Sequence, residues 1–552
     1  ETKVRDAELS GVGLVGEQRE RFKQIETESA ELATRFTNNL LDSTKAFTLD
    51  LTSEEDVEGL PLTWKGAAAQ MAAGAGLTRD GEPPSPEAGP WRLTLDAPMY
   101  VPFLQHSRRQ DLREQVYRAT ISRASEGETD NVPIMKQMLE LRKETAVLLG
   151  YLSFAEVSLA EKMAGTVGAV NQLMTQIQDA ALPKSRQELD GLEEFAGTKL
   201  ELWDTAFWAE RQREQLFDYT DEQLRPYFPL PRVLDGLFDI AQELFGVTIN
   251  PSDGETPVWD PSVRFFRVTD DTGAEIAAFY LDPYSRSSNK RSGAWMNVCL
   301  SRKRMPDGSI RLPVAYLCCN QSPPVGDVPS LMSFTEVFTL FHEFGHGLQH
   351  MLTTVDHPQA AGIANVEWDA VEVPSTFMQQ WCYDHDTLIG VTKHHETGAA
   401  LPEELFDKIN GARTFMSGTA ICRQIYFSEI DMQLHDTFDP SGNESIFERQ
   451  HKVARDSLVM QPLPEDRFLC SFSHIFSGSY SAGYYSYIWA AVLAADAFEA
   501  FTEGQGSRSD VGRRFRETIL SLGGGRHPMD VFKDFRGRPP STEPLMRMLG
   551  LK

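Results

Sequence analysis

The sequence predicts a mainly helical protein with a small β-sheet in its second half, and three observations support this fold class. Long stretches repeat apolar residues at the three- and four-residue spacing of amphipathic helices. Between residues 263 and 320, short β-branched and aromatic runs replace that spacing. The 552 residues are 41% hydrophobic and 24% charged, which is the ordinary composition of a folded chain with a sizeable core.

The first half is predicted to be a stack of helices. From Val15 to Phe47, apolar residues recur at helical spacing with charged residues between them, so one long helix is expected. The same periodicity predicts helices over residues 108–148, 155–195 and 230–245. The stretch from Thr78 to Trp91 is predicted to be a surface loop, because it contains the helix and strand breakers Gly81, Pro83, Pro84, Pro86, Gly89 and Pro90.

Three strands are predicted within this helical chain. They cover Val263 to Val268, Glu275 to Asp282 and Arg311 to Asn320. The residues Asp270 to Gly273 supply turn chemistry between the first two strands. From Ser330 the chain is predicted to be helical almost to its end, with Gly and Pro clusters at 440–442 and 523–525.

Charge and hydropathy exclude two classes of partner. A net charge of −27 opposes binding to phosphate backbones, so no nucleic acid is expected. A negative field also suits cationic peptides, although plain solubility is the favoured interpretation of the acidic surplus. No window has the roughly 18 apolar residues that a membrane span requires, so no membrane is expected.

The cysteines and the first residues bear on the compartment. The six cysteines have no spacing typical of disulfide frameworks or thiolate zinc sites, which favours a reducing compartment. The start, from Glu1 to Arg5, is not a signal peptide and lacks an initiating Met, so a processed chain is expected. The prediction is a cytoplasmic protein, or one in a chloroplast or mitochondrion after removal of a targeting segment, and not a secreted one.

One segment has the residue types and spacing of a catalytic zinc site. Ser333 to Glu336 has the form of a capping box, so a helix should begin near Phe334. His342 and His346 lie four residues apart on one side of that helix, which lets two imidazoles reach one zinc ion. Glu343 lies on the neighbouring edge, close enough to touch a water on the metal. The alternative is two surface histidines on an ordinary helix.

Spacing alone does not identify the third ligand. The residues from Val366 to Ser375 offer three carboxylates, Glu367, Asp369 and Glu372. Without further information a helical pair is favoured, in which one residue is the ligand and another braces a histidine. Four other histidines, His385, His394, His395 and His435, are interpreted as isolated surface residues rather than metal sites.

A second cluster runs from Phe472 to Tyr487 and is dense in glycine, serine and tyrosine. This composition suits a loop that bends closely round a ligand, and peptide hydrolysis needs donors aimed at the developing oxyanion. Tyr480, Tyr484 and Tyr487 also have helical spacing, so an aromatic stripe that packs in the core is an equal alternative.

At these residues the sequence resembles the thimet oligopeptidase family of zinc metallopeptidases, most closely its oligopeptidase A branch, which includes plant-type organellar members. The resemblance is carried by the segments Leu340 to His350, Glu367 to Ser375 and His474 to Tyr487. Further similarity is visible at residues 224–228, 280–284 and Arg291 to Met296. It covers essentially the whole chain.

The resemblance implies a role for each candidate residue. His342, His346 and Glu372 would bind one zinc ion per chain, and Glu343 would be the general base. His474, Tyr480 and Tyr487 would help stabilise the tetrahedral intermediate as catalytic residues, and Tyr484 and Gly478 would be substrate-binding. The implied activity is that of a metalloendopeptidase which cuts short unfolded peptides.

The resemblance also implies an architecture. The expected fold is a large helical two-lobed body with a deep central channel and a small β-sheet near the zinc site. Residues 1–150 would form an N-terminal helical lobe that is incomplete at its start, residues 151–260 a helical region bridging the lobes, and residues 261–552 the zinc-binding catalytic region. The strand from Arg311 to Asn320 would be the sheet edge on which a peptide lies, unless it is an internal strand paired on both sides.

Two other functions remain open from the sequence. One is a non-catalytic peptide-binding protein that captures peptides in the channel, which the presence of Glu343 opposes. The other is a zinc exopeptidase that shares the HExxH helix. The partners expected are short peptides as substrates, and the chain is expected to be a monomer.

Overall fold

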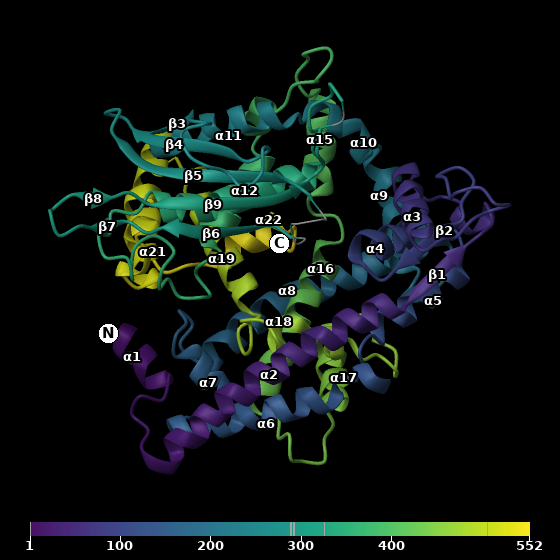
Figure 1. Cartoon of the computed structure of the whole chain (residues 1–552), viewed down its shortest axis with the longest axis horizontal. Helices are drawn as coiled ribbons and strands as arrows, with labels where there is room; N and C mark the ends of the chain where they lie inside the picture. Colours follow the sequence, from purple (N-terminus) through teal and green to yellow (C-terminus); the bar gives the residue numbers. More distant parts are fainter. Residues whose placement is uncertain (1, 287–289, 291–292, 325, 505) are drawn as a thin grey trace. The chain divides into compact units, whose positions relative to one another are not determined.

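The structure is a computed structural model that describes residues 2–286, 290, 293–324, 326–504 and 506–552. Glu1, Arg291 and Ser292, which the sequence analysis used, lie outside the described residues. Contacts divide the chain into two compact units (Figure 1). Unit 1 comprises Glu1–Ala160, Gly165–Leu216 and Met416–Tyr485, and unit 2 comprises Glu161–Ala164, Phe217–Phe415 and Ser486–Lys552.

Unit 1 is built almost entirely from helices. Its long helix α2 (Gly16–Ala46) buries Phe22, Ile25, Leu32 and Phe36, which confirms the helix predicted from Val15 to Phe47. The other elements are α1 (Thr2–Leu9), β1 (Thr48–Leu51), α3 (Leu62–Gly74), β2 (Trp91–Thr94), α4 (Ala97–His106), α5 (Gln110–Ile121), α6 (Val132–Leu149), α7 (Phe154–Leu159), α8 (Val167–Ala196), α9 (Thr205–Phe217), α16 (Ser417–Asp436), α17 (Ile446–Ser457) and α18 (Ser473–Phe476).

The two longer helical predictions for this unit are each broken once. The predicted range 108–148 divides into α5 and α6, and at the start of α6 the buried side chain of Asn131 donates to the backbone oxygens of Phe36 and Cys470. The range 155–195 divides at Gly165, whose φ of +67° is left-handed, before Thr166 caps α8. The stretch before Trp91 contains no helix or strand from residue 78 on, which confirms the predicted loop.

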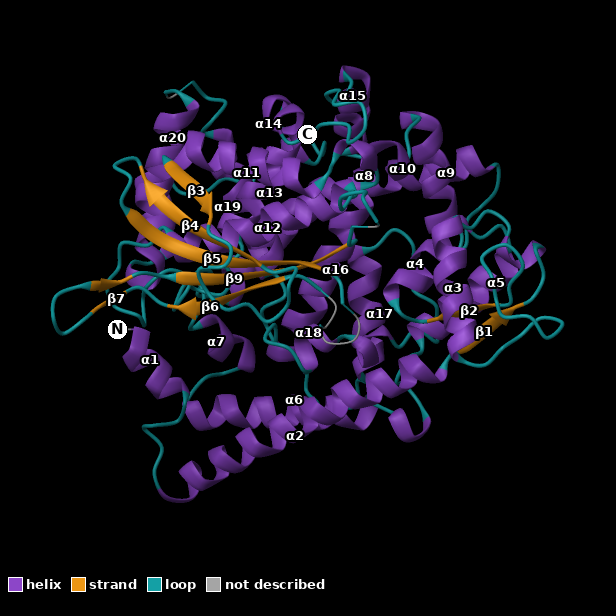
Figure 2. Cartoon of the chain, turned by 45° about the horizontal axis from the view of Figure 1, so that its top comes forward, coloured by secondary structure: helices purple, strands orange, loops and turns teal. Residues whose placement is uncertain are grey.

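Unit 2 combines helices with a five-stranded sheet of order β3-β4-β5-β9-β6 (Figure 2). The strands β5 and β9 are parallel and the other pairs are antiparallel. The strands are β3 (Val247–Pro251), β4 (Arg264–Asp270), β5 (Glu275–Tyr284), β6 (Trp295–Leu300), β7 (Lys303–Arg304), β8 (Ile310–Arg311) and β9 (Val314–Gln321). The helices are α10 (Asp221–Leu224), α11 (Leu230–Phe245), α12 (Phe334–Met351), α13 (Val373–Gln380), α14 (His385–Gly390), α15 (Glu403–Ala412), α19 (Ser486–Glu499), α20 (Arg508–Phe515), α21 (Pro528–Arg536) and α22 (Glu543–Met548).

The prediction that the strand from Arg311 to Asn320 is a sheet edge is wrong. Its main part, β9, pairs with β5 on one side and with β6 on the other, so it is internal. The edge on that side is β6, whose run from Trp295 to Leu300 was not recognised as a strand. The fold class itself, mainly helical with a small sheet, is confirmed, and the central channel stays a prediction.

Helix α12 covers the sheet with its apolar face. Val337, Phe341, Phe344 and Leu348 are each at most 1% exposed and share one core with Phe279 and Leu317 of the strands. The stripe predicted from the sequence is therefore the face that fixes α12 on β5, β9 and β6.

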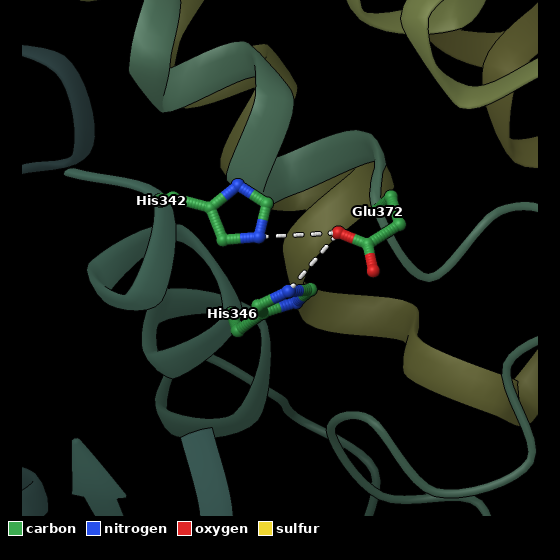
Figure 3. Close-up of side chains that lie close together, drawn as sticks. All are labelled: His342, His346 and Glu372. Carbon is green, nitrogen blue, oxygen red and sulfur yellow. Dashed lines mark ion pairs between the residues drawn. The ribbon is translucent and has the colours of Figure 1, made fainter. Parts of the chain in front are cut away.

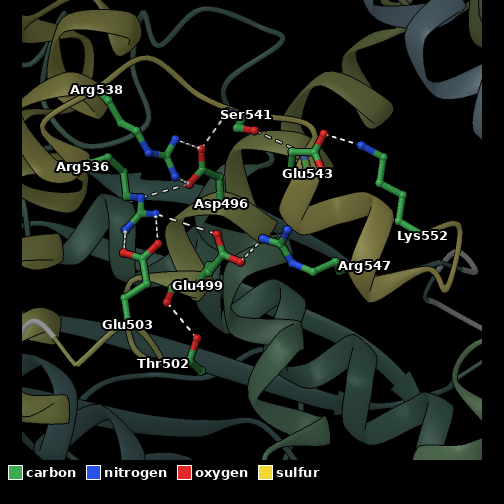
Figure 4. Close-up of polar contacts among 10 residues, drawn as sticks. All are labelled: Asp496, Glu499, Thr502, Glu503, Arg536, Arg538, Ser541, Glu543, Arg547 and Lys552. Carbon is green, nitrogen blue, oxygen red and sulfur yellow. Dashed lines mark hydrogen bonds and ion pairs between the residues drawn. The ribbon is translucent and has the colours of Figure 1, made fainter.

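A buried ion-pair network holds the C-terminal helices of unit 2 together (Figure 4). Asp496 of α19 is fully buried and accepts hydrogen bonds from Arg536, Arg538 and the backbone N–H of Ser541, over 2.6–2.9 Å. Arg536 also makes two bonds of 2.8 Å to Glu503. We call this set the Asp496 network. It joins α19 to α21 and to the segment before α22.

The structure also bears on membrane and disulfide chemistry. Among the described residues, no helix has both the length and the hydropathy that crossing a bilayer demands. All six cysteines are free thiols, and five of them are buried. Burial raises the pKa of Cys318 and of Cys422 to about 11 each, so these thiols stay protonated and unreactive at neutral pH.

Candidate metal centre

The helix that carries the two histidines begins where the sequence predicts. The hydroxyl of Ser333 accepts a hydrogen bond of 3.1 Å from the backbone N–H of Glu336, and the Glu336 carboxylate accepts one of 2.6 Å from the backbone N–H of Ser333. This capping box starts α12 at Phe334. Because the apolar stripe of α12 is fixed on the sheet, His342 and His346 both project from the remaining surface, one turn apart.

Glu372 meets both histidines from a separate segment (Figure 3). One of its carboxylate oxygens, Oε2, lies 3.3 Å from Nε2 of His342 and 3.2 Å from Nε2 of His346. A tetrahedral zinc ion with bonds of about 2.0–2.2 Å holds its ligand atoms about 3.4 Å apart. The spacing and the donor set of two imidazoles and one carboxylate therefore both fit zinc. Within the described part of the chain, these three residues are the group of this kind that could hold a metal ion.

A close helix crossing brings Glu372 to this position. A β-carbon added to Gly345, between the two histidines, would lie 2.5 Å from the backbone oxygen of Pro374 and 2.5 Å from Cα of Ser375. Only glycine permits α13 to approach α12 this closely. Glu372 is the residue directly before α13, and the Ser375 hydroxyl donates a bond of 3.0 Å to its Oε2.

Asp369 is one of the three carboxylates that spacing allowed as the third metal ligand, and in the structure it binds backbone N–H groups instead. It is fully buried and accepts hydrogen bonds from the backbone N–H groups of Met163 (2.7 Å) and Ala164 (2.9 Å). These two residues belong to the short stretch Glu161–Ala164, which is separated from the rest of unit 2 along the sequence. Asp369 therefore ties the turn before Glu372 to a distant segment.

Glu343 has the surroundings expected of a general base. Its side chain is 5% exposed, and its Oε2 is buried without a hydrogen-bond partner among the described residues. Burial raises the pKa of Glu343, and the neighbouring imidazoles oppose that rise only in part. A carboxylate in this state accepts a proton more readily than an exposed one.

The two histidines and Glu372 perturb one another. Burial would raise the pKa of Glu372, but hydrogen bonds from His342 and His346 hold it well below its ordinary value. Burial would lower the pKa of His342, but the bond to Glu372 raises it overall. A divalent cation bound to these atoms would compete with protons for them.

The second predicted cluster is a loop rather than a continuous helix. After α18 ends at Phe476 the chain turns through residues 477–485, and α19 begins at Ser486. Gly478 lies against the end of α18, where an added β-carbon would meet the backbone oxygen of His474 at 2.8 Å. We call residues 477–485 the tyrosine loop. Tyr480 lies in this loop between the two helices, and its predicted role around a ligand stays a prediction.

The core interpretation is confirmed for Tyr484. Its side chain is 7% exposed, and its ring packs against those of Phe427, Phe472 and His474 at centroid distances of 5.1–5.6 Å. Tyr480 is half-buried and its ring lies 6.0 Å from that of His474. His474 itself is exposed.

The predicted site residues are divided between the two units. Unit 2 contains His342, Glu343, His346 and Glu372, which the structure brings together, and Tyr487 in the first turn of α19. Unit 1 contains the other four, which are His474, Gly478, Tyr480 and Tyr484. Their catalytic or substrate-binding roles stay predictions.

Three residues that support the site were not singled out from the sequence. Gly345 sets the helix crossing, Ser375 orients Glu372, and Nε2 of His350 donates a bond of 2.9 Å to the backbone oxygen of Leu300, which fixes α12 on the edge strand β6. A glycine within a helix is a recognised signal of close packing, so Gly345 was detectable. The partners of Ser375 and His350 lie elsewhere in space and gave no local signal.

Comparison with known proteins agrees with this geometry. Residues 103–551 match peptidase family M3. The chain is 51% identical over 565 residues to organellar oligopeptidase A, chloroplastic/mitochondrial, of Arabidopsis thaliana, with 100% of this chain and 71% of the relative covered. It is 41% identical over 559 residues to oligopeptidase A of Escherichia coli (strain K12), with 100% and 80% covered. These matches confirm the resemblance that the motifs carry.

A solved structure shares the fold. PZ peptidase A, determined with an inhibitor, superposes with a TM-score of 0.53 at 14% sequence identity, over 97% of this chain and 76% of that one. Identity this low supports the architecture alone, and the residues of the candidate site rest on the geometry described above.

Proposed function

The chain belongs to peptidase family M3 and is a metallopeptidase, and from that premise we propose that it is a zinc-dependent endopeptidase that hydrolyses internal bonds of short, unfolded peptides. The observation that supports this most is the convergence of His342, His346 and Glu372 at the spacing of a tetrahedral zinc site, beside the buried carboxylate of Glu343. The same donor set with one open position is typical of catalytic zinc.

The metal would be held by Nε2 of the two histidines and by the Glu372 carboxylate, one ion per chain. When bound there, zinc supplies Lewis-acid polarisation of a water molecule and of the scissile carbonyl. Ser375 holds Glu372 through its hydroxyl, which keeps the carboxylate oriented toward both imidazoles.

Glu343 carries the proton in the proposed mechanism. Its unpartnered Oε2 takes a proton from the attacking water and then gives it to the nitrogen of the leaving amine. A raised pKa suits both halves of this transfer, because the group must accept the proton and then release it near neutral pH.

His474, Tyr480 and Tyr487 are proposed to donate hydrogen bonds to the oxyanion that develops on the scissile carbonyl. Loss of one such donor typically reduces turnover by about a hundred- to a thousandfold. Tyr484 and Gly478 are proposed to shape the substrate-binding surface, and the burial of Tyr484 makes it a packing element of that surface rather than a proton donor.

The remaining proposals concern partners and compartment. Short peptides are the substrates, and the chain acts as a monomer. The name of the organellar relative supports a chloroplast or mitochondrial location, and a relative named probable cytosolic oligopeptidase A, of Arabidopsis thaliana, supports a cytoplasmic one.

Exchange of Glu343 for Gln tests the proposal. The variant keeps the shape of the site but accepts no proton, so cleavage of an internally quenched peptide is expected to fall by about a hundred- to ten-thousandfold while the zinc content stays at one per chain. Glu429 is the matched control, because burial also raises its pKa and it lies in unit 1. Glu429→Gln should keep the wild-type turnover, and substantial turnover in Glu343→Gln would falsify the assignment.

The choice of peptide separates the alternatives. A peptide blocked at both ends is still cut by an endopeptidase but resists an exopeptidase. A protein that only captures peptides would leave it intact with or without added zinc. Mass spectrometry of the products then reports the position of the cut.

A further inference from the structure

The tyrosine loop of unit 1 is held by a buried carboxylate that the proposed chemistry does not use. Asp431 of α16 is fully buried and accepts hydrogen bonds from three consecutive backbone N–H groups, those of Ala482, Gly483 and Tyr484. The three distances are 2.8, 2.8 and 2.9 Å. Successive N–H groups that converge on one anion form a nest, and here the anion is a side chain of the protein itself.

Two further residues, His435 and Arg142, extend the buried contacts of Asp431. Nδ1 of His435 lies 2.9 Å from its carboxylate, and Nε2 of the same imidazole lies 2.7 Å from Nη1 of Arg142. Arginine only donates, so Nε2 must accept and the ring proton must lie on Nδ1, which donates it to the backbone oxygen of Asp431 at 2.8 Å. Desolvation lowers the pKa of Arg142 to about 10, which still leaves it charged at neutral pH. The Arg142 guanidinium therefore holds the His435 imidazole in place beside the Asp431 carboxylate.

The His435 side chain is itself fully buried, with an exposed fraction of 0%. The interpretation of His435 as an isolated surface histidine is therefore wrong. Its sequence neighbours gave no sign of this, because Arg142 lies 293 residues earlier in the chain.

The loop backbone is also held from its other side. The hydroxyl of Ser158 in α7 donates to the backbone oxygens of Ser481 (2.8 Å) and Ala482 (3.1 Å). Ala482 has a φ of +46°, a left-handed conformation that is strained for a residue with a side chain. That conformation persists because Asp431 binds the N–H groups on one side and Ser158 the carbonyls on the other.

From this geometry we infer that Asp431, oriented by His435 and Arg142, is a positioning residue that fixes the tyrosine loop in the conformation needed for turnover. The inference rests on the proposed role of Tyr480, whose backbone oxygen accepts a bond of 2.9 Å from the N–H of Gly483, one of the three groups held by Asp431. Asp431 is fully buried and acts through its three hydrogen bonds to the loop.

Exchange of Asp431 for Asn tests the inference. An amide offers one acceptor oxygen and turns its NH₂ toward the remaining N–H groups, so it cannot hold all three. A misplacement of about 1 Å is expected to lower kcat by on the order of a hundredfold. The zinc dissociation constant should stay at the wild-type value, because the metal ligands lie in the other unit. Hydrogen exchange at Ala482, Gly483 and Tyr484 should become faster.

Asp466→Asn is the matched control. Asp466 is a buried carboxylate of the same unit, and it accepts bonds from Gln450 and from the backbone N–H of Phe468. This control should keep kcat and the slow exchange of the tyrosine loop, whatever it costs in stability. If Asp431→Asn does not fold, Ser158→Ala provides the test, since it removes only a hydroxyl and should lower kcat with the same faster exchange.

The outcomes separate the inference from the proposed function. Unchanged kcat in Asp431→Asn, or in Ser158→Ala if that variant replaces it, overturns the inference, and so does an equal fall of kcat in Asp466→Asn. Tyr480→Phe is measured beside them. If it keeps full turnover, the proposed role of Tyr480 fails, and the inference, which acts through that loop, fails with it. A fall in Tyr480→Phe with no fall in Asp431→Asn overturns the inference alone.

Discussion

The metal cluster and the Asp496 network are both buried groups of charged residues in unit 2, and they differ in how completely their polar atoms are hydrogen-bonded. Asp496 fills its acceptor sites with two arginines and one backbone N–H, and Arg536 fills its remaining donors with Glu503. In the metal cluster, Oε2 of Glu343 and Nδ1 of His346 are buried without partners among the described residues.

This difference indicates that the Asp496 network serves the stability of the fold and that the metal cluster serves its chemistry. Burial of an unpartnered polar group costs free energy, so a fold retains one only where something else repays the cost. In the Asp496 network nothing more is needed, because the protein supplies every partner. In the metal cluster, Oε2 of Glu343 lacks a partner that a water molecule would supply.

The largest effect is expected from breaking the complete network. Asp496→Ala leaves Arg536 and Arg538 without their central acceptor, and Arg536 is 1% exposed in its side chain. Removal of one member of a buried ion pair costs about 3–5 kcal/mol, which should appear in the free energy of unfolding measured with denaturant. The zinc affinity should not change.

An exposed pair provides the control for this variant. The ion pair between Arg526 and Asp534 has both side chains nearly half exposed. Asp534→Ala should therefore cost at most about 1 kcal/mol. Equal costs for Asp496→Ala and Asp534→Ala would contradict the structural role of the network.

Zinc that binds to the metal cluster should stabilise the folded protein. Binding to the folded state alone stabilises it by about 2.7 kcal/mol when free zinc exceeds the dissociation constant a hundredfold. The melting temperature should therefore rise on addition of zinc and fall on chelation, in the wild type and in Asp496→Ala alike. In Glu372→Ala the rise should disappear. A rise of the same size in that variant would show that zinc binds elsewhere.

Replacement by alanine should lower the zinc affinity at one glycine of α12 but not at the other. Gly345→Ala forces α13 away and displaces Glu372, so the zinc affinity is expected to fall by about 10- to 100-fold. Gly347→Ala meets only the end of the flexible Leu317 side chain at 3.0 Å and should leave the affinity nearly unchanged. Competition with a chelator measures both.

Gly512→Ala controls for steric strain in general. Its added β-carbon would lie 2.3 Å from the backbone oxygen of Leu244, a clash as severe as that at Gly345 but remote from the histidines. This variant should lose stability and keep its zinc affinity. A similar loss of affinity in Gly512→Ala would mean that the effect of Gly345→Ala is not local.

The last expected effect is a dependence of the zinc affinity on pH. The pKa of His342 is raised in the metal-free cluster, so the proton competes with zinc up to a higher pH than for an ordinary histidine. As the pH falls through that raised pKa, the zinc affinity should fall by about tenfold per unit for each proton displaced. Titration of the dissociation constant between pH 6 and 8 measures this, and a constant value would exclude the linkage.

Local patterns were sufficient to predict the helix of the metal site. Ser333 and Glu336 marked its start, and the four apolar residues of its stripe all lie in the core. The reason is that capping and amphipathic periodicity act within a few residues of one another. Glu372 was beyond this range, because only the crossing of two helices at Gly345 selects it from Glu367 and Asp369, and its identification needed the family resemblance.

Non-local pairing explains what the sequence did not predict. The internal position of β9 depends on β6, a strand whose short run from Trp295 to Leu300 has no clear alternation. The burial of His435 depends on Asp431 and on an arginine far away in the chain. In each case the deciding contact joins segments that are distant in sequence, and no local pattern encodes such a contact.

The hydrogen bonds from Met163 and Ala164 to Asp369 limit which fragments of the chain can form the metal site. A fragment that begins at Phe217 contains all three metal-binding side chains, yet it lacks both N–H groups that hold Asp369, which is buried three residues from one of those side chains. During synthesis the same two residues leave the ribosome some two hundred positions ahead of their acceptor, so the early part of the chain must wait for the later part before the centre is complete. The candidate metal site therefore depends on residues from Met163 to Glu372, and a fragment cut from the second half of the chain would lack part of its support.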